Sequence, residues 1–259
     1  SQSEATISSY STLSEPAPLP PAGSTTPRRT GAADQESWVA IARPIPIFGL
    51  ESPELERQPA VFDARRSADG TRREDLLSFG GFAEPKPHLA LRLAVQHERD
   101  ELSRPFIVAL VRMAAARGLS VHRSSLPAAI ETRFGPVEAA DVTLSDGASG
   151  RACIAFRMEG GTVPLALNGW WCGGEGKPAD RRQLVCLIDR IDLLAAGEDA
   201  ALRSAFARSE LNRQPGCAPP RLSASGRKVS WLDADAPTPA LRTKTGTAQP
   251  GAARRAEKR

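Results

Sequence analysis

Residues 151–172, RACIAFRMEGGTVPLALNGWWC, decide the fold expected for this chain. Two apolar runs, 151–158 and 163–172, flank a Glu-Gly-Gly segment, a pattern typical of two strands joined by a turn. Upstream, AIETRFGPVEAADVTL at 129–144 precedes a turn signal at Asp146-Gly147. This part of the chain therefore predicts three or four antiparallel strands.

A first strand-rich block covers residues 38–97. WVAIARPIPIF at 38–48 is predicted to be an edge strand, because Pro44 and Pro46 exclude a helix. An Asp69-Gly70 turn lies between two extended runs and indicates a hairpin. Strict alternation of apolar residues in HLALRLAVQH at 88–97 predicts a half-buried strand.

Three segments carry helix signals. Ser103 is a candidate N-cap, apolar residues recur at helical spacing from Phe106, and Gly118 stands where a helix would end. Asp180, with Gln183 three residues later, resembles a capping box. EDAALRSAFARSEL at 198–211 is predicted to be the last helix.

The two ends of the chain differ in composition from its middle. Residues 1–37 and 232–259 are rich in small and polar residues and have few large apolar side chains, so neither buries enough surface to offset its conformational entropy. We therefore predict one α+β domain at 38–231, with antiparallel strands in two blocks and about three helices. It is flanked by a disordered Ser/Pro-rich linker and a disordered basic tail.

The net charge of +4 belongs to the tail. From Arg221 onward the chain has nine Lys or Arg against three acidic residues, so the rest carries about −2. Such a tail can contact lipid or nucleic acid but is more often a solvated spacer, and nucleic acid is not expected as a partner.

No stretch approaches the roughly 18 apolar residues of a membrane span. The start at Ser1 fits a processed or truncated chain.

Four cysteines, Cys153, Cys172, Cys186 and Cys217, lie between long flanks that have none. Their irregular spacing differs from the close ligand pairs of zinc sites and from the C-x-x-C of redox dithiols. We expect two disulfides and an extracytoplasmic location; four reduced cysteines in a cytosolic core are the alternative. Of three possible connectivities we favour Cys153–Cys172 and Cys186–Cys217, since each joins segments close along the chain.

Motifs for catalysis are missing from the sequence. It has no P-loop, no G-x-G-x-x-G and no G-x-S-x-G, and His97 begins only a near miss of H-E-x-x-H. We therefore predict no catalytic residues, no cofactor and no metal. A hydrolase that uses a carboxylate pair remains the alternative, with Glu131 or Glu138 facing a second acid in a cleft.

Two features are candidates for a partner interface. Trp170 and Trp171 are adjacent, so on a strand they face opposite sides, and one could be exposed beside a glycine loop; the alternative is that both are covered. Four arginines surround the Asp69-Gly70 turn and form a basic tip, or simply a solvated hairpin end. They are Arg65, Arg66, Arg72 and Arg73.

The run FGPVEAADVTL…RACIAFR…GWWCGG…CLIDRIDLL…FARSELNRQPGC resembles uncharacterised proteins of alphaproteobacteria. The resemblance covers most of residues 38–217 and implies a membrane-anchored envelope protein, with no known activity. It implies no catalytic residues.

These observations predict a non-enzymatic periplasmic binding or assembly module. A flexible N-terminal linker would tether it, with a reach of roughly 30 Å, to the inner membrane through a segment ahead of this chain. The expected partner is a protein of the envelope. A hydrolase acting on glycan is the runner-up, and contact of the basic tail with lipid or nucleic acid is a third possibility.

Overall fold

The computed structural model describes residues 37–101 and 103–217. From Trp38 onward these residues form one compact unit. The strands and helices, including the short 3-10 helices η1 and η2, follow in chain order: β1 (Trp38–Ala40), β2 (Phe48–Leu50), η1 (Pro53–Leu55), β3 (Ala60–Ser67), β4 (Arg73–Phe79), β5 (His88–Val95), α1 (Phe106–Ala115), β6 (Ser120–Ser124), β7 (Ala128–Thr132), β8 (Gly135–Ser145), β9 (Gly150–Met158), β10 (Leu165–Cys172), α2 (Arg181–Asp189), β11 (Ile191–Leu193), α3 (Ala200–Ser209) and η2 (Glu210–Asn212).

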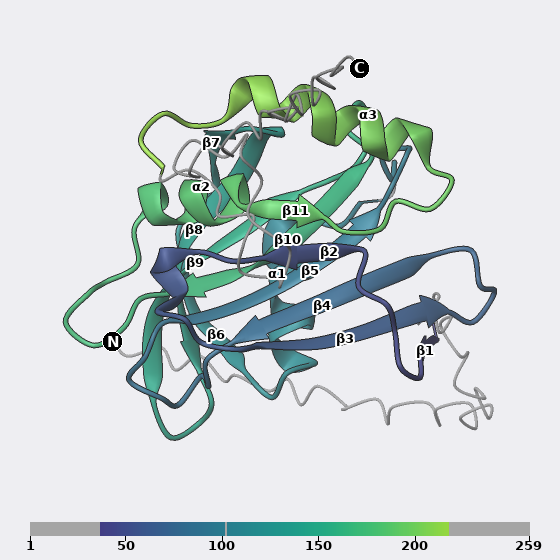
Figure 1. The fold of residues 1–259 in the computed structure, drawn as a ribbon. Helices are drawn as coiled ribbons and strands as arrows, with labels where there is room; N and C mark the ends of the chain where they lie inside the picture. Colours follow the sequence, from purple (N-terminus) through teal and green to yellow (C-terminus); the bar gives the residue numbers. More distant parts are fainter. Residues whose placement is uncertain (1–36, 102, 218–259) are drawn as a thin grey trace, which may run out of the picture. The chain divides into compact units, whose positions relative to one another are not determined.

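One nine-stranded antiparallel sheet organises the domain (Figure 1). Its strand order is β1-β3-β4-β5-β10-β9-β8-β6, and β7 pairs with part of β8. The two strand-rich blocks expected from the sequence are joined where β5 pairs with β10, with Leu91 opposite Gly169. The predicted α+β class is confirmed, and the blocks form a single sheet.

Each face of this sheet has its own core. On the α1 face, Phe106, Leu110 and Ala114 pack with Trp170. On the opposite face, α2, α3 and the two-stranded ribbon β2–β11 cover residues that include Leu91 and Trp171. Figure 1 shows α1 behind the sheet and the other elements in front of it. The alternating sequence of the strands supplies both cores, because successive side chains point to opposite faces.

Most of the local predictions from the sequence are confirmed. The hairpins at Gly70 and Gly147 are present, and both glycines have positive φ. The capping box of α2 is formed: the Asp180 side chain accepts from the backbone N–H of Gln183, whose own side chain accepts from the N–H of Asp180.

Two local predictions are wrong. The expected strand at 38–48 is divided into β1 and β2, which belong to different sheets. The N-cap of α1 is Pro105 and makes no side-chain cap, because the Ser103 hydroxyl bonds to Glu159 instead.

None of the helices in the described ranges is long and apolar enough to cross a membrane. The predictions for residues 1–36 and 218–259 lie outside the described residues.

Candidate functional site

Both disulfides of the favoured connectivity are present. Cys153 on β9 stands directly opposite Cys172 on β10, with an S–S distance of 2.02 Å. Cys186 of α2 is bonded to Cys217 at 2.01 Å and so ties the segment after η2 to a core helix. Disulfides persist in oxidising compartments, so the pair indicates an extracytoplasmic environment.

The tryptophans cannot be interface anchors, which corrects that prediction. They do face opposite sides of β10, but Trp170 is 0% and Trp171 1% exposed. The Trp170 indole N–H donates to Nε2 of His88 under α1, and that of Trp171 donates to the side chain of Gln183 in α2. Helices cover both faces of the sheet here, so no side of the strand is left for a partner.

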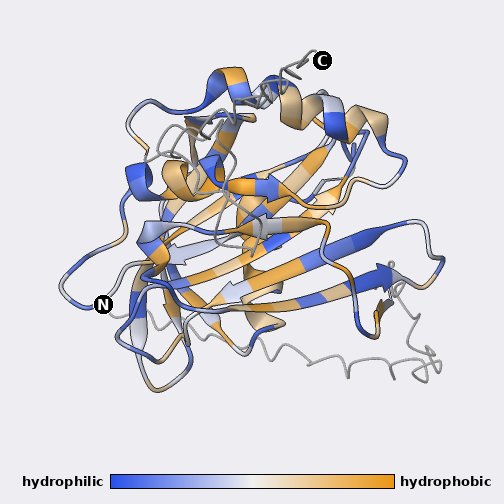
Figure 2. Cartoon of the chain, in the orientation of Figure 1, coloured by the Kyte–Doolittle hydropathy of each residue, from blue (hydrophilic) through white to orange (hydrophobic). Residues whose placement is uncertain are grey.

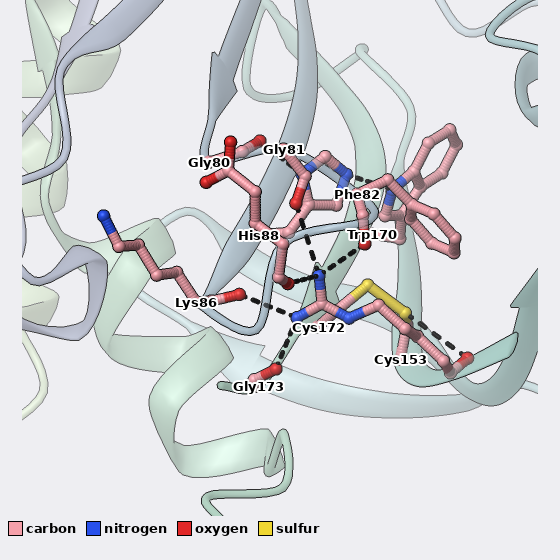
Figure 3. Close-up of a disulfide and its surroundings, with 11 residues drawn as sticks. Gly80, Gly81, Phe82, Lys86, His88, Cys153, Trp170, Cys172 and Gly173 are labelled. Atoms are coloured by element: carbon pink, nitrogen blue, oxygen red, sulfur yellow. Dashed lines mark hydrogen bonds between the residues drawn. A yellow bond between two sulfur atoms is a disulfide. The ribbon is translucent and has the colours of Figure 1, made fainter. Parts of the chain in front are cut away.

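Beside the first disulfide, Arg151 organises the neighbouring loops. Its guanidinium donates to backbone carbonyls of the β4–β5 connection and to the carbonyl of Gly173 after β10. Figure 3 shows Gly81, Phe82 and Lys86 gathered around Cys153–Cys172. These bonds occupy the guanidinium, so Arg151 has a structural role. The sequence carried no signal for it, because its acceptors are main-chain atoms of distant residues.

The four arginines of the predicted tip divide between the two faces of the β3–β4 hairpin. Arg66 stands opposite Arg73 on one face, where Arg73 bonds to Asp75 at 2.8 Å. On the other face, Arg65 and Arg72 both lie over the ring of Trp38, 5.0 and 5.8 Å from its centre. Figure 2 shows the hydrophilic hairpin end.

Two further arginines extend that second group along the α1 face of the sheet. Arg92 on β5 bonds to Glu74 at 2.8 Å, and Glu74 also bonds to Arg65 at 2.7 Å. Arg117, after α1, donates to the Ser78 hydroxyl at 3.0 Å. We call Arg65, Arg72, Arg92 and Arg117 the arginine surface. Arg92 and Arg65 lie on different strands, and only the tertiary fold brings the four arginines together.

The charges of the arginine surface act on one another. Burial lowers the pKa of Arg92, Glu74 opposes the shift, and repulsion from Arg65 and Arg72 adds to it. Burial likewise lowers the pKa of Arg117, and Arg65 and Arg92 reinforce the effect. Asp63 on β3 opposes the shift of the Arg117 pKa. Four arginines beside two carboxylates, Glu74 and Asp63, still favour the approach of an anionic group.

A cavity of about 440 Å³ lies on the other face of the sheet, against the β2–β11 ribbon and α3. Its apolar wall comes from Phe48, Leu50, Phe62, Leu77, Leu194 and Phe206. The polar residues of the wall are Glu51, Arg133, Asp192 and Glu210. A mostly apolar wall with a few polar groups is the common form of a small-molecule site.

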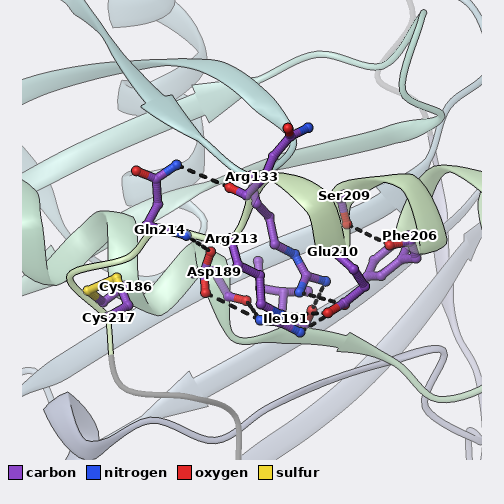
Figure 4. Close-up of polar contacts among 11 residues, drawn as sticks. Arg133, Cys186, Asp189, Ile191, Phe206, Ser209, Glu210, Arg213, Gln214 and Cys217 are labelled. Carbon is purple, nitrogen blue, oxygen red and sulfur yellow. Dashed lines mark hydrogen bonds and ion pairs between the residues drawn. A yellow bond between two sulfur atoms is a disulfide. The ribbon is translucent and has the colours of Figure 1, made fainter.

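Arg133 is the unusual member of this wall, because its side chain is only 1% exposed. It donates to the Ile191 carbonyl at 2.9 Å and to Glu210 at 3.2 Å (Figure 4). Its guanidinium also lies 4.5 Å from the ring centre of Phe134. Its Nε–H is a buried side-chain donor with no partner in the described part of the chain.

Asp192 is also perturbed: burial raises the pKa of its carboxyl, and Arg133 and Arg213 oppose the shift. Sequence reasoning missed the pair Arg133 and Asp192, since an arginine in a turn and an aspartate among ion pairs both look like surface residues. Asp189 is buried and bonds to Arg213 at 3.3 Å.

The acids named for a hydrolase do not form the predicted cleft. Glu138 bonds to Arg157 at 2.7 Å, and Glu131 is exposed on β7. Neither lines the cavity described above. His97 bonds to Asp199 at 2.9 Å, and no group of three or more potential metal ligands occurs within residues 37–101 and 103–217.

No protein-family model matches the chain, and no match was found among curated proteins or solved structures. Its function is therefore inferred from the chemistry of its surfaces and cavities.

Proposed function

We propose that the chain is a non-enzymatic binding module of the bacterial envelope, working in the periplasm. Residues 1–37 serve as its linker to the inner membrane, and its partner is a protein with an acidic surface. The two disulfides support the compartment, because a reducing cytosol would not maintain them. The arginine surface supports the mode of binding.

The arginine surface is the observation that carries this proposal. Arg65 and Arg92 share one carboxylate, Glu74, which is 8% exposed, whereas the two arginine side chains are 33% and 34% exposed. Asp63, exposed on β3, is a second carboxylate near Arg117, so the cluster has four arginines against two acids and is cationic overall. Arginine forks suit the bidentate recognition of carboxylates, so acidic side chains of a protein are the matching partner.

Charge reversal on the full chain tests the proposal. The probe is a fluorescein-labelled peptide of alternating glutamate and serine, followed by fluorescence anisotropy at low and raised salt. Arg72→Glu combined with Arg117→Glu should weaken binding by roughly tenfold or more, since each of the two charges contributes up to about 1 kcal/mol. If the double variant does not fold, Arg72→Glu alone is used for the binding measurement.

Arg66→Glu is the matched control. It makes the same charge change on the same hairpin but on the opposite face of β3, so it should leave binding nearly unchanged. Equal losses in Arg66→Glu and Arg72→Glu would show a diffuse effect of net charge and overturn the site. Binding to phosphatidylglycerol vesicles but not to the peptide would replace the protein partner with a membrane.

A glycan hydrolase is the second candidate, because the cavity holds two carboxylates. Asp192 has a raised pKa through burial, and Glu210 bonds to Arg213 at 2.6 Å. A carboxyl group with a raised pKa beside a second, paired carboxylate is the arrangement of many glycoside hydrolases. The test is release of reducing ends from peptidoglycan strands by wild type, Asp192→Asn and Glu210→Gln. If wild type releases none, this candidate is excluded.

A further inference from the structure

The two faces of the nine-stranded sheet are covered unequally. On one face the β2–β11 ribbon, α2 and α3 form a layer, and Leu77 and Phe79 of β4 are each 3% exposed beneath it. On the other face the core around α1 takes its strand residues from β5, β6, β8, β9 and β10. The described residues of β1, β3 and β4 lie outside that core, so these three strands have one face without a packed layer.

The strand register shows which side chains occupy this face. Residues directly opposite each other in an antiparallel pair point to the same side. Three rows therefore share it: Val61–Ser78–Ala90, Asp63–Leu76–Arg92 and Arg65–Glu74–Ala94. Ala90 belongs to the α1 core, which identifies the face. Among these residues Val61 is 62% exposed, and Leu76 is half-buried.

Trp38 of β1 lies on the same face, because the guanidinium groups of Arg65 and Arg72 lie over its ring. Its side chain is half-buried. We call Trp38, Val61 and Leu76, together with the arginine surface around them, the open sheet surface. It combines apolar side chains with clustered positive charge.

The width of the open sheet surface suits one helix. Neighbouring strands lie about 4.7–4.9 Å apart, so three strands span roughly 14 Å, and an α-helix with its side chains is about 10–12 Å across. The C-terminal end of α1 borders this surface, since Arg117 donates to the Ser78 hydroxyl of β4. A second helix beside α1 would cover the sheet in the way that helices cover sheets in α+β domains.

The exposed side of α1 is itself apolar. Ile107, Val108 and Val111 are 41%, 42% and 45% exposed. The exposed side of α3, in contrast, carries Arg203 and Arg208. An apolar outward side is typical of a helix that packs against a further element.

Charge distinguishes the possible occupants of the open sheet surface. A second copy of this chain would bring two arginine surfaces together, each with four arginines against two carboxylates, and they would repel each other. A purely acidic segment would pair with the arginines but leave Trp38 and Val61 without apolar contacts. A helix with an apolar stripe and acidic flanks matches both features.

We propose that the open sheet surface binds an amphipathic helix of the partner protein. The apolar stripe of that helix lies on Trp38, Val61 and Leu76, and its acidic residues meet the arginine surface. This inference rests on the proposed function, in which the partner is acidic, and adds the form of the segment that is recognised.

Two fluorescein-labelled peptides of leucine, alanine and glutamate test the proposal with the full chain. Both have the same composition and about 18 residues, but only one repeats leucine at the helical spacing i, i+3, i+4 and i+7. The amphipathic peptide should bind about tenfold more tightly than the shuffled one, because only its leucines reach the sheet together. Its circular dichroism should show more helix when it is bound.

Equal affinities of the two peptides would overturn the amphipathic helix. The proposed function would still stand if the peptide of alternating glutamate and serine bound and Arg72→Glu weakened it. If none of the three acidic peptides bound, the proposed function itself would be wrong.

Two exposed valines locate the bound helix. Val61 lies on the open sheet surface, whereas Val39, 51% exposed on β1, stands opposite Arg66 and faces the other side of the sheet. Val61→Ser should weaken binding of the amphipathic peptide by about fivefold, leaving the glutamate–serine peptide nearly unaffected. Val39→Ser is the matched control and should bind both peptides as wild type does. Wild-type affinity of Val61→Ser for the amphipathic peptide would refute the proposed site.

Discussion

The indole N–H of Trp170 donates a hydrogen bond to Nε2 of His88, 3.1 Å away and beneath α1. The other ring nitrogen of His88 lies 2.8 Å from the carbonyl oxygen of Gly80. Nε2 must accept and Nδ1 must donate, so this arrangement requires the neutral imidazole with its proton on Nδ1. Figure 3 shows the pair beside Cys153–Cys172.

This geometry predicts a loss of stability in mild acid. Burial lowers the pKa of His88, and Arg151 and Arg117 add to the shift despite the bond to Gly80. The unfolded chain therefore binds a proton at a higher pH than the folded one, and stability falls as pH decreases through the ordinary histidine value of ~6.5. Urea unfolding from about pH 7.5 to about pH 5 measures it.

His88→Gln is the control for that effect, because its side-chain oxygen can still accept from Trp170 but does not titrate. Carboxylates titrate in both proteins, so the informative quantity is the difference between them. If wild type and His88→Gln show the same pH dependence, His88 is not the responsible group.

Replacing either buried tryptophan should destabilise the domain strongly. Trp170→Ala and Trp171→Ala each remove a fully buried ring and its hydrogen bond, and about 3–5 kcal/mol of the free energy of unfolding should be lost. Leu211→Ala, at a residue 88% exposed, should change it by less than ~0.5 kcal/mol. Wild-type stability for Trp171→Ala would contradict the burial of that ring under α2.

Each disulfide should contribute about 3 kcal/mol to stability. The two bonds close loops with separations of 19 and 31 residues, which constrain the unfolded chain to a similar extent. Cys153→Ser/Cys172→Ser and Cys186→Ser/Cys217→Ser measure the two contributions separately by denaturant unfolding.

Intact mass after alkylation, with and without reductant, should show four protected cysteines in protein from its native host. Four free thiols would remove the support for a periplasmic location.

Replacement by asparagine should change the stability of the protein in opposite directions at two aspartates that lie three residues apart. Burial raises the pKa of Asp192, so its charge opposes folding and stability declines as pH rises through the raised value. Asp192→Asn should therefore stabilise the protein at neutral pH. Asp189→Asn should destabilise it by about 1–3 kcal/mol, because Asp189 accepts from Arg213 and from the backbone N–H of Gln214. Thermal melts of both variants at neutral pH test this prediction. A change of stability in the same direction for both variants would contradict it.

Local sequence signals determined a large part of the architecture. Turn glycines placed the hairpins, alternation placed the strands, and the capping box at Asp180 placed α2, because each of these effects acts within a few residues. The spacing of the cysteines also favoured the connectivity that the fold contains. The sequence by itself therefore determined the α+β class, but it only favoured the two disulfide pairs, and the opposed register of Cys153 and Cys172 in the sheet comes from strand pairing.

Only the tertiary structure decided which residues form the arginine surface and the cavity. Pairing of β5 with β10 joins the two blocks. Pairing of β4 with both β3 and β5 sets Arg92 beside Arg65, although 26 residues separate them in the chain. Packing of helices on both faces covers Trp170 and Trp171, which strand alternation alone could not reveal. Arg133 is buried because distant elements close around it. Such outcomes depend on long-range packing, and no pattern within a single segment encodes which partner will cover it.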